Sequence, residues 1–168
     1  MNDSFEILAR GVLIGIGATA TMDVYAIVAN RWFGLPMSNW AFVGRWIGHF
    51  RHGQFMQQSI AAAQPVRGEL AIGWLAHYIV GALYGVLLLA ICGLEWAHQP
   101  TLLPAMLVGL SMLIAPFFIM QPGMGAGIAS SKTPKPNAAR LRSVLNHAVF
   151  GLGMYATAWL LVLVDPTV

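Results

Sequence analysis

The sequence predicts an all-α polytopic membrane protein, with four transmembrane helices arranged as two repeated hairpins and a short cytoplasmic amphipathic helix. Two observations support this prediction. Of the 168 residues, 58% are hydrophobic and only 9% are charged, whereas soluble domains usually carry about 25% charge. The few charges leave four long apolar segments between them, each close to the roughly 20 residues that cross a bilayer as a helix. We therefore expect residues 1–168 to form a single transmembrane domain.

The first apolar segment is expected to span about residues 8–30. Between Arg10 and Arg31 its only charge is Asp23, and a segment of about 20 residues makes about 30 Å of helix. Its apolar region is too long, and its beginning too acidic, for a cleaved signal peptide.

The connection after this segment is long and basic, and we expect it to contain a short amphipathic helix. Apolar residues recur there at helical spacing with basic residues between them: Trp40, Val43, Ile47 and Phe50. Such a helix lies in the membrane interface, although an ordinary packed loop is the alternative. The residues expected at the interface or at lipid headgroups are Trp40, Arg45, Trp46, Lys132 and Arg140.

The three remaining apolar segments run over residues 70–94, 101–121 and 143–164. The segment 70–94 holds no formal charge, and it is long enough to tilt in the membrane. Pro122 and the glycines after it are expected to interrupt the helix at the end of the third segment. The connection between the second and third segments is expected to be a tight turn.

The distribution of basic residues predicts the topology. Eight of the nine Lys and Arg residues lie in two connections, residues 31–69 and 122–142, which share one side of a four-helix membrane protein. Under the positive-inside rule both connections are cytoplasmic, and both termini are then periplasmic in a bacterial inner membrane. The basic charge therefore indicates topology and anionic lipid headgroups rather than a nucleic-acid partner.

An internal repeat relates the two halves, residues 8–94 and 101–164. At one constant offset the third segment matches the first: Gly11 with Gly109, Met22 with Met120, and Asp23 with Gln121. At another constant offset the fourth matches the second: Leu75 with Leu145, His77 with His147, and Gly81 with Gly151. Both pairs run in the same direction, which predicts a pseudo-twofold axis along the membrane normal.

Four polar residues form the candidate substrate or ion site: Asp23, His77, Gln121 and His147. Helix rise places all four in the cytoplasmic half of the membrane, on four different helices. An ionisable group at the middle of a bilayer costs roughly 2.5–3.5 kcal/mol, so Asp23 and the histidines are expected to face one another. A purely structural clamp between helices is the alternative.

Metal binding at these positions is a further alternative. Two histidines and a carboxylate can hold iron or zinc, and the set would be Asp23, His77 and His147. No pair of them has the i, i+3 or i+4 spacing that would favour a metal. The sequence therefore indicates no particular cofactor.

The leading functional hypothesis is proton-linked handling of a small solute or ion through the buried Asp/His cluster. The alternatives are a membrane-embedded enzyme or metal protein acting on a lipid-soluble substrate, and a structural or accessory membrane subunit. Because four helices enclose little room for a pathway, we also expect a homo-oligomer, most simply a dimer.

Several stretches resemble one family of small membrane proteins. They are GIGATATMD, VGRWIGH, GWLAHY, and MQPGMG followed by SSKTPKP. They resemble an uncharacterised family of bacterial inner-membrane proteins, domain of unknown function twenty-nine thirty-eight, over nearly the whole chain. The resemblance implies four helices in the inner membrane and implies no activity, substrate or site residue.

Overall fold

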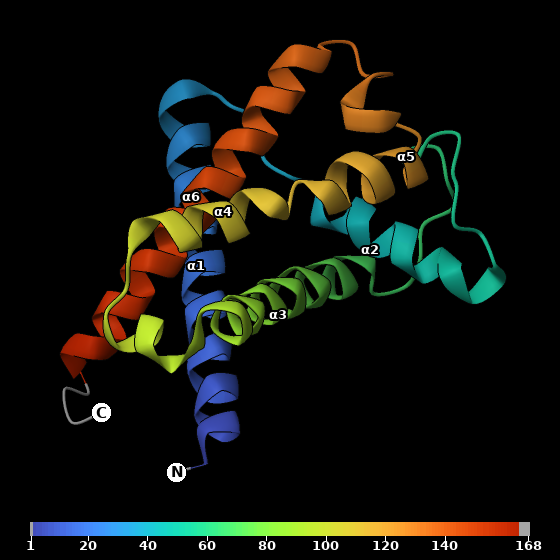
Figure 1. Cartoon of the computed structure of the whole chain (residues 1–168). Coiled ribbons are helices and arrows are strands. Elements are labelled where there is room, and N and C mark those ends of the chain that lie inside the picture. Colours follow the sequence, from blue (N-terminus) through green and yellow to red (C-terminus); the bar gives the residue numbers. More distant parts are fainter. Residues whose placement is uncertain (1, 165–168) are drawn as a thin grey trace. The chain divides into compact units, whose positions relative to one another are not determined.

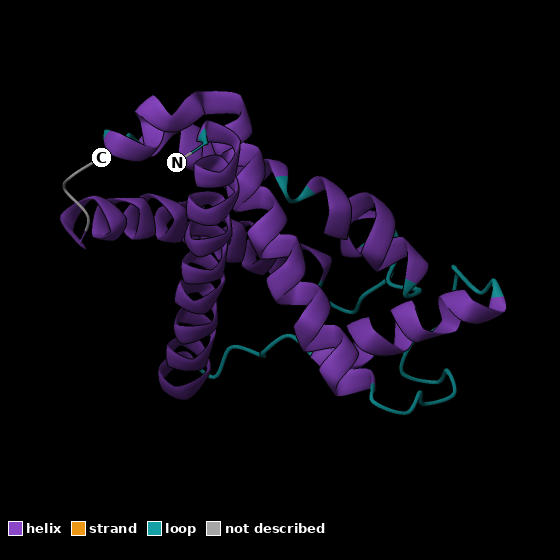
Figure 2. Ribbon diagram, turned by 90° about the horizontal axis from the view of Figure 1, so that it is seen from below, coloured by secondary structure: helices purple, strands orange, loops and turns teal. Residues whose placement is uncertain are grey.

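The computed structural model describes residues 2–164, and these contain helices, turns and loops but no strand (Figure 2). The predicted all-α fold is therefore confirmed for the described residues. Asp165, the acidic residue that follows the fourth apolar segment, lies outside them.

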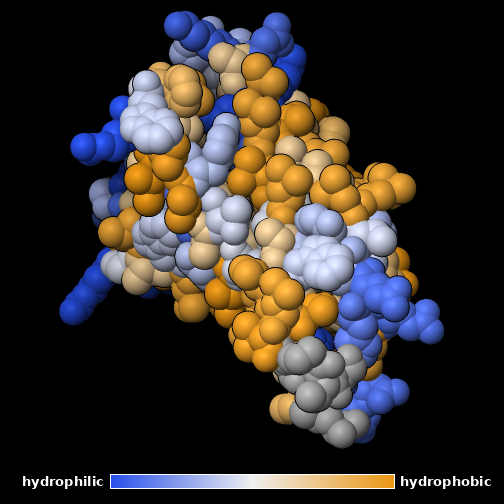
Figure 3. Space-filling model, turned by 90° about the vertical axis from the view of Figure 1, so that its left-hand side faces the viewer, coloured by the Kyte–Doolittle hydropathy of each residue, from blue (hydrophilic) through white to orange (hydrophobic). Residues whose placement is uncertain are grey.

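The helices follow the predicted apolar segments and extend a few residues beyond them (Figure 1). They are α1 (Asp3–Phe33), α2 (Trp40–His49), α3 (Glu69–His98), α4 (Leu102–Ser111), α5 (Gln121–Gly123) and α6 (Pro136–Val164), with short turns η1 (Phe50–His52), η2 (Pro116–Met120) and η3 (Ile128–Ser130). Four stretches are long and apolar enough to cross a membrane: Asp3–Phe33, Glu69–His98, Leu102–Gly123 and Pro136–Val164. Hydrophobic side chains cover much of the face shown in Figure 3.

The described chain divides into two compact units. The first unit consists of residues 2–35, 78–112 and 145–164, and the second unit consists of residues 36–77 and 113–144. The first unit holds the hydrophobic core, whose largest fully buried apolar side chains are Ile14, Leu88, Leu89, Phe150 and Met154.

Glycines bring α1 into close backbone contact with α3 in the first unit. A Cβ on Gly15 would overlap the carbonyl of Gly81, and a Cβ on Gly85 would overlap the carbonyl of Gly11. The hydroxyl of Thr19 donates to the carbonyl of Gly15 at 2.8 Å, so this polar group is satisfied within its own helix. Small residues allow this close approach. In a membrane such packing contributes to helix association, because burying an apolar side chain between helices gains little over contact with lipid.

Similar contacts join α6 to its neighbours in the first unit. A Cβ on Gly109 of α4 would lie 2.7 Å from the Cα of Gly151, and one on Gly153 would lie 2.8 Å from the Cα of Ala18 in α1. Small residues thus give the long helices of this unit their closest backbone contacts.

The third span is interrupted earlier than the sequence predicts. Its first helix, α4, ends at Ser111, and a π-type turn begins at Pro116. Because Pro116 has no N–H, it cannot bond the carbonyl of Met112 four residues before it. The span still ends at Gly123, next to the predicted break at Pro122.

The connection between the second and third spans is also shorter than predicted. Gly93 has φ 75° and ψ 177°, a conformation outside the helical region, yet helix resumes and continues to His98. Only glycine adopts this backbone conformation readily. The predicted turn over residues 95–100 is therefore mostly helical, and three residues, 99–101, lead into α4.

Candidate functional site

Asp23, the one charged residue of the first apolar segment, has a partner from the second span. It is half-buried on α1, and its Oδ2 accepts a hydrogen bond from the hydroxyl of Tyr78 on α3 at 3.0 Å. Both residues belong to the first unit. The contact gives one oxygen of the carboxylate a neutral hydrogen-bond donor. The pairing of Asp23 with His77 remains a prediction.

His77 belongs to the second unit and lies against two tryptophans. Its ring stacks on Trp40 with centroids 3.8 Å apart and an interplanar angle of 26°. Trp74 meets it edge-on at 5.8 Å. The aromatic faces of such a pair attract positive charge.

The same contacts place the beginning of α2 beside the second and third turns of α3. Eight residues separate Glu69 from His77, which is about 12 Å of helix, and Trp40 stacks at that height. The backbones of α2 and α3 meet at Gly44 and Gly73, where no Cβ would fit. A short helix, α2, lies at this place, and Trp40 at its beginning contacts the candidate site residue His77.

Gln121 and His147 lie in different units. Gln121 is half-buried in the second unit, and its Oε1 accepts a hydrogen bond from the Ser130 hydroxyl at 3.0 Å. Ser130 is 5% exposed and has φ 59°, a left-handed conformation that costs free energy in a residue with a side chain. His147 is half-buried on α6 in the first unit.

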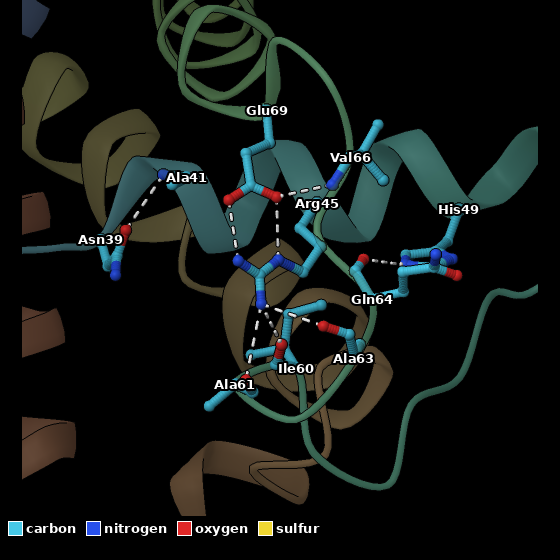
Figure 4. Close-up of polar contacts among 10 residues, drawn as sticks. All are labelled: Asn39, Ala41, Arg45, His49, Ile60, Ala61, Ala63, Gln64, Val66 and Glu69. Atoms are coloured by element: carbon cyan, nitrogen blue, oxygen red, sulfur yellow. Dashed lines mark hydrogen bonds and ion pairs between the residues drawn. The ribbon is translucent and has the colours of Figure 1, made fainter.

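Arg45, predicted to reach lipid headgroups, is buried in the second unit (Figure 4). Its Nε and Nη2 donate to the two carboxylate oxygens of Glu69 at 2.9 and 2.8 Å. Its Nη1 donates to the carbonyls of Ile60 and Ala63 at 3.2 and 3.1 Å. The structure thus gives Arg45 a different partner, because its donors are occupied by a carboxylate and by loop carbonyls.

Hydrogen bonding to Glu69 raises the pKa of Arg45. Glu69 precedes the apolar segment 70–94, and hydrogen bonds from Arg45 and from the Val66 amide lower its pKa to about 2. The pair therefore stays ionised at ordinary pH and holds the loop between α2 and α3.

The other residues predicted at the interface differ in exposure. The indole Nε1 of Trp46 donates to the carbonyl of Phe55 at 2.9 Å, and the Nε of Arg140 donates to the carbonyl of Ala129 at 2.8 Å. Lys132 is exposed, so of the three predicted cations it is the most accessible.

A second buried ionic cluster joins the start of α1 to the end of α3. Glu6 and Arg10 are 7% and 8% exposed, and their side chains pair at 2.7 Å. His98 Nε2 lies 3.5 Å from the same Glu6 oxygen. The i, i+4 spacing of Glu6 and Arg10 indicates a pair from the sequence, whereas the approach of His98 needs the fold.

Metal coordination finds no support among residues 2–164. No group of three His, Cys, Asp or Glu side chains in this part of the chain is placed to hold a metal ion.

These features define a class: all-helical proteins with four helices long and apolar enough to cross a membrane, and with polar side chains inside those helices. A model of the family described as Protein of unknown function (DUF2938) matches residues 12–161. The chain therefore belongs to this family, as the resemblance in the sequence predicts. Comparison with curated proteins and with solved structures gives no match.

Proposed function

We propose that the protein handles a small solute or ion across the membrane in a proton-linked manner, with Asp23 as its proton-exchanging carboxylate. One observation supports this most directly: the only charged residue in segments 11–30, 70–94, 101–121 and 143–164 is Asp23, and it is hydrogen-bonded by Tyr78 from another span. Ionisable residues in apolar spans are costly, and they commonly serve ion or proton pathways.

The surroundings of Asp23 suit reversible protonation. The Tyr78 hydroxyl can donate to the carboxylate or remain beside the neutral acid. His77, the preceding residue of α3, stacks on Trp40. In this proposal Gln121 and His147 are the remaining polar groups of the substrate or ion site.

Proton flux into liposomes tests the proposal. Purified protein is reconstituted with a pH-sensitive dye inside, and a potassium diffusion potential is imposed with and without small organic acids, amines and inorganic cations. We expect the wild type to exceed empty liposomes at least fivefold in one condition and Asp23→Asn to abolish that excess. Glu95→Gln, an exposed carboxylate at the end of α3, is the matched control and should retain it. Flux that survives Asp23→Asn would refute the proposal.

We propose a bacterial inner membrane as the location, with both termini periplasmic. The second unit carries seven Lys and Arg residues and one acid, whereas the described first unit carries two arginines and four acids. This separation of charge supports a cytoplasmic second unit. Reporter fusions within residues 53–58 should behave as cytoplasmic, and fusions within 96–99 or after Val168 as periplasmic.

We also propose the two-hairpin repeat and a homodimer. Both hairpins use glycine contacts, α1 with α3 and α4 with α6, which supports the repeat. Their contacts are one helical turn apart in register, because Gly11 meets Gly85 whereas Gly109 meets Gly151. Mass measurement in detergent should give twice the chain mass, and a monomer alone would contradict the dimer.

A further inference from the structure

We propose that the second unit carries a binding surface for the headgroups of anionic lipids, formed by residues 50–58 and 128–135 together with Arg67. This surface does not depend on the proposed proton-linked activity. Of the interface residues that the sequence predicts it includes only Lys132, because the other four have partners within the second unit.

The surface has an excess of positive charge that the second unit does not neutralise. The unit contains one acid, Glu69, and Arg45 pairs with it. Arg140 and Arg142 donate to the backbone carbonyls of Ala129 and Pro36. Four cations of the unit remain exposed: Arg51, Arg67, Lys132 and Lys135.

Large apolar side chains accompany these cations outside the four spans. Phe55 is 58% exposed, Met56 is 69% exposed and Ile128 is 58% exposed. Each follows or precedes one of the exposed cations by a few residues. Apolar side chains beside Lys and Arg are typical of segments that enter the headgroup region of a membrane.

The segment 50–58 is held by hydrogen bonds at and next to its end to other parts of the second unit. The amide of Gln57 donates to the carbonyl of Gly123 at 2.8 Å, and the amide of Ile60 donates to the carbonyl of Met124 at 3.0 Å. The Trp46 indole also bonds the Phe55 carbonyl. Because this segment is tied down before any lipid binds, less conformational entropy is lost on binding.

The exposed cations of this surface suit a phosphate group as ligand. Its apolar side chains favour a lipid as the molecule that carries this phosphate. A free phosphate compound would use only the cations, whereas Phe55 and Met56 gain by contact with acyl chains or glycerol backbones. Arg67 lies two residues before α3, so the surface adjoins a helix long and apolar enough to cross a membrane.

The test counts lipids retained by the full chain in detergent, by native mass spectrometry with phosphatidylglycerol or phosphatidylcholine added. We expect the wild type to prefer phosphatidylglycerol and a variant with all four exposed cations changed to Gln to lose at least tenfold of that preference, since each cation near a membrane contributes about fivefold. Asp3→Asn with Glu95→Gln changes charges in the first unit and should leave the preference within twofold. An unchanged preference in the four-cation variant would overturn the proposal.

Two further measurements distinguish a lipid from a free phosphate compound and keep the proposal testable if a variant misfolds. Phe55→Ser with Met56→Ser should weaken retention of both lipids. If it has no effect and glycerol 3-phosphate competes as well as phosphatidylglycerol, the surface binds free phosphate and the lipid proposal fails. If the four-cation variant does not fold, the wild type is measured in 0.5 M salt, which shortens the screening length to the order of 4 Å. A preference for phosphatidylglycerol that does not change in this salt overturns the proposal.

Discussion

Removal of the Glu69 carboxylate should release the loop between α2 and α3. In Glu69→Gln one carboxylate oxygen becomes an NH2 group that cannot accept, so the Arg45 guanidinium loses its charged partner and one of the two short hydrogen bonds, at 2.8 and 2.9 Å. The paired side chains are 10% and 17% exposed, close to the buried case. Breaking one partner of a buried pair costs about 3–5 kcal/mol, so we expect about 2–4 kcal/mol for this partly exposed pair.

Hydrogen exchange of the full chain in detergent measures this loss locally. Amides over residues 60–66 should exchange roughly 30- to 1,000-fold faster in Glu69→Gln, which is the same free energy expressed as an opening equilibrium. Arg67→Gln, a nearby exposed cation, is the matched control and should change exchange less than about twofold.

A double-mutant cycle decides whether the two side chains act as a pair. Arg45→Met combined with Glu69→Gln should cost less than the sum of the single changes, by about 1–3 kcal/mol. Additive effects would show that each residue stabilises the loop separately, and the pairing argument would then be wrong.

The lowered pKa of Glu69 gives the same prediction a pH dependence. A carboxyl whose folded-state pKa lies below its unfolded value contributes stability that is present above the unfolded value and lost as the pH falls. For Glu69 this window runs from about 4.5 down to about 2. Exchange over residues 60–66 should therefore accelerate in that window in the wild type and not in Glu69→Gln.

Three further perturbations follow from the first unit. Gly15→Ala should destabilise the fold by about 1–3 kcal/mol, measured by unfolding in mixed micelles, because the new Cβ overlaps backbone; Gly17→Ala, which meets a threonine side chain, should cost less. Glu6→Gln should destabilise by about 2–4 kcal/mol, and adding Arg10→Met should restore part of that loss; no restoration would contradict a buried pair. Tyr78→Phe should lower the proposed proton flux severalfold without unfolding, and unchanged flux would separate the hydroxyl from the activity.

The spanning segments are predictable because the bilayer imposes length and apolarity together. Residues 8–30, 70–94 and 143–164 each fall within a helix of the structure. The interruptions are less predictable, since they depend on single residues in otherwise apolar runs. Pro116 carries a readable signal, the missing amide, whereas nothing around Gly93 distinguishes it from the glycines that pack inside helices.

Polar partners within the loops depend on contacts far apart in the chain. Arg45 and Glu69 are 24 residues apart, and no periodicity relates them. One signal does exist: Glu69 is the single acid among eight basic residues in the two basic connections, and an isolated acid beside many cations is expected to pair. The sequence does not indicate which cation is the partner.

The second unit joins a candidate site residue to the loops through one short helix. Trp40 at the start of α2 stacks on His77, and Arg45 one turn later holds Glu69 and the loop carbonyls. Close contact between Gly44 and Gly73 leaves little freedom for α2 to slide along α3. A change in the position of the His77 ring would therefore act on Trp40 first, and α2 could follow only by bending or by breaking the Arg45–Glu69 pair. The Trp40–His77 stack and the Arg45–Glu69 pair thus both hold α2 against the beginning of α3.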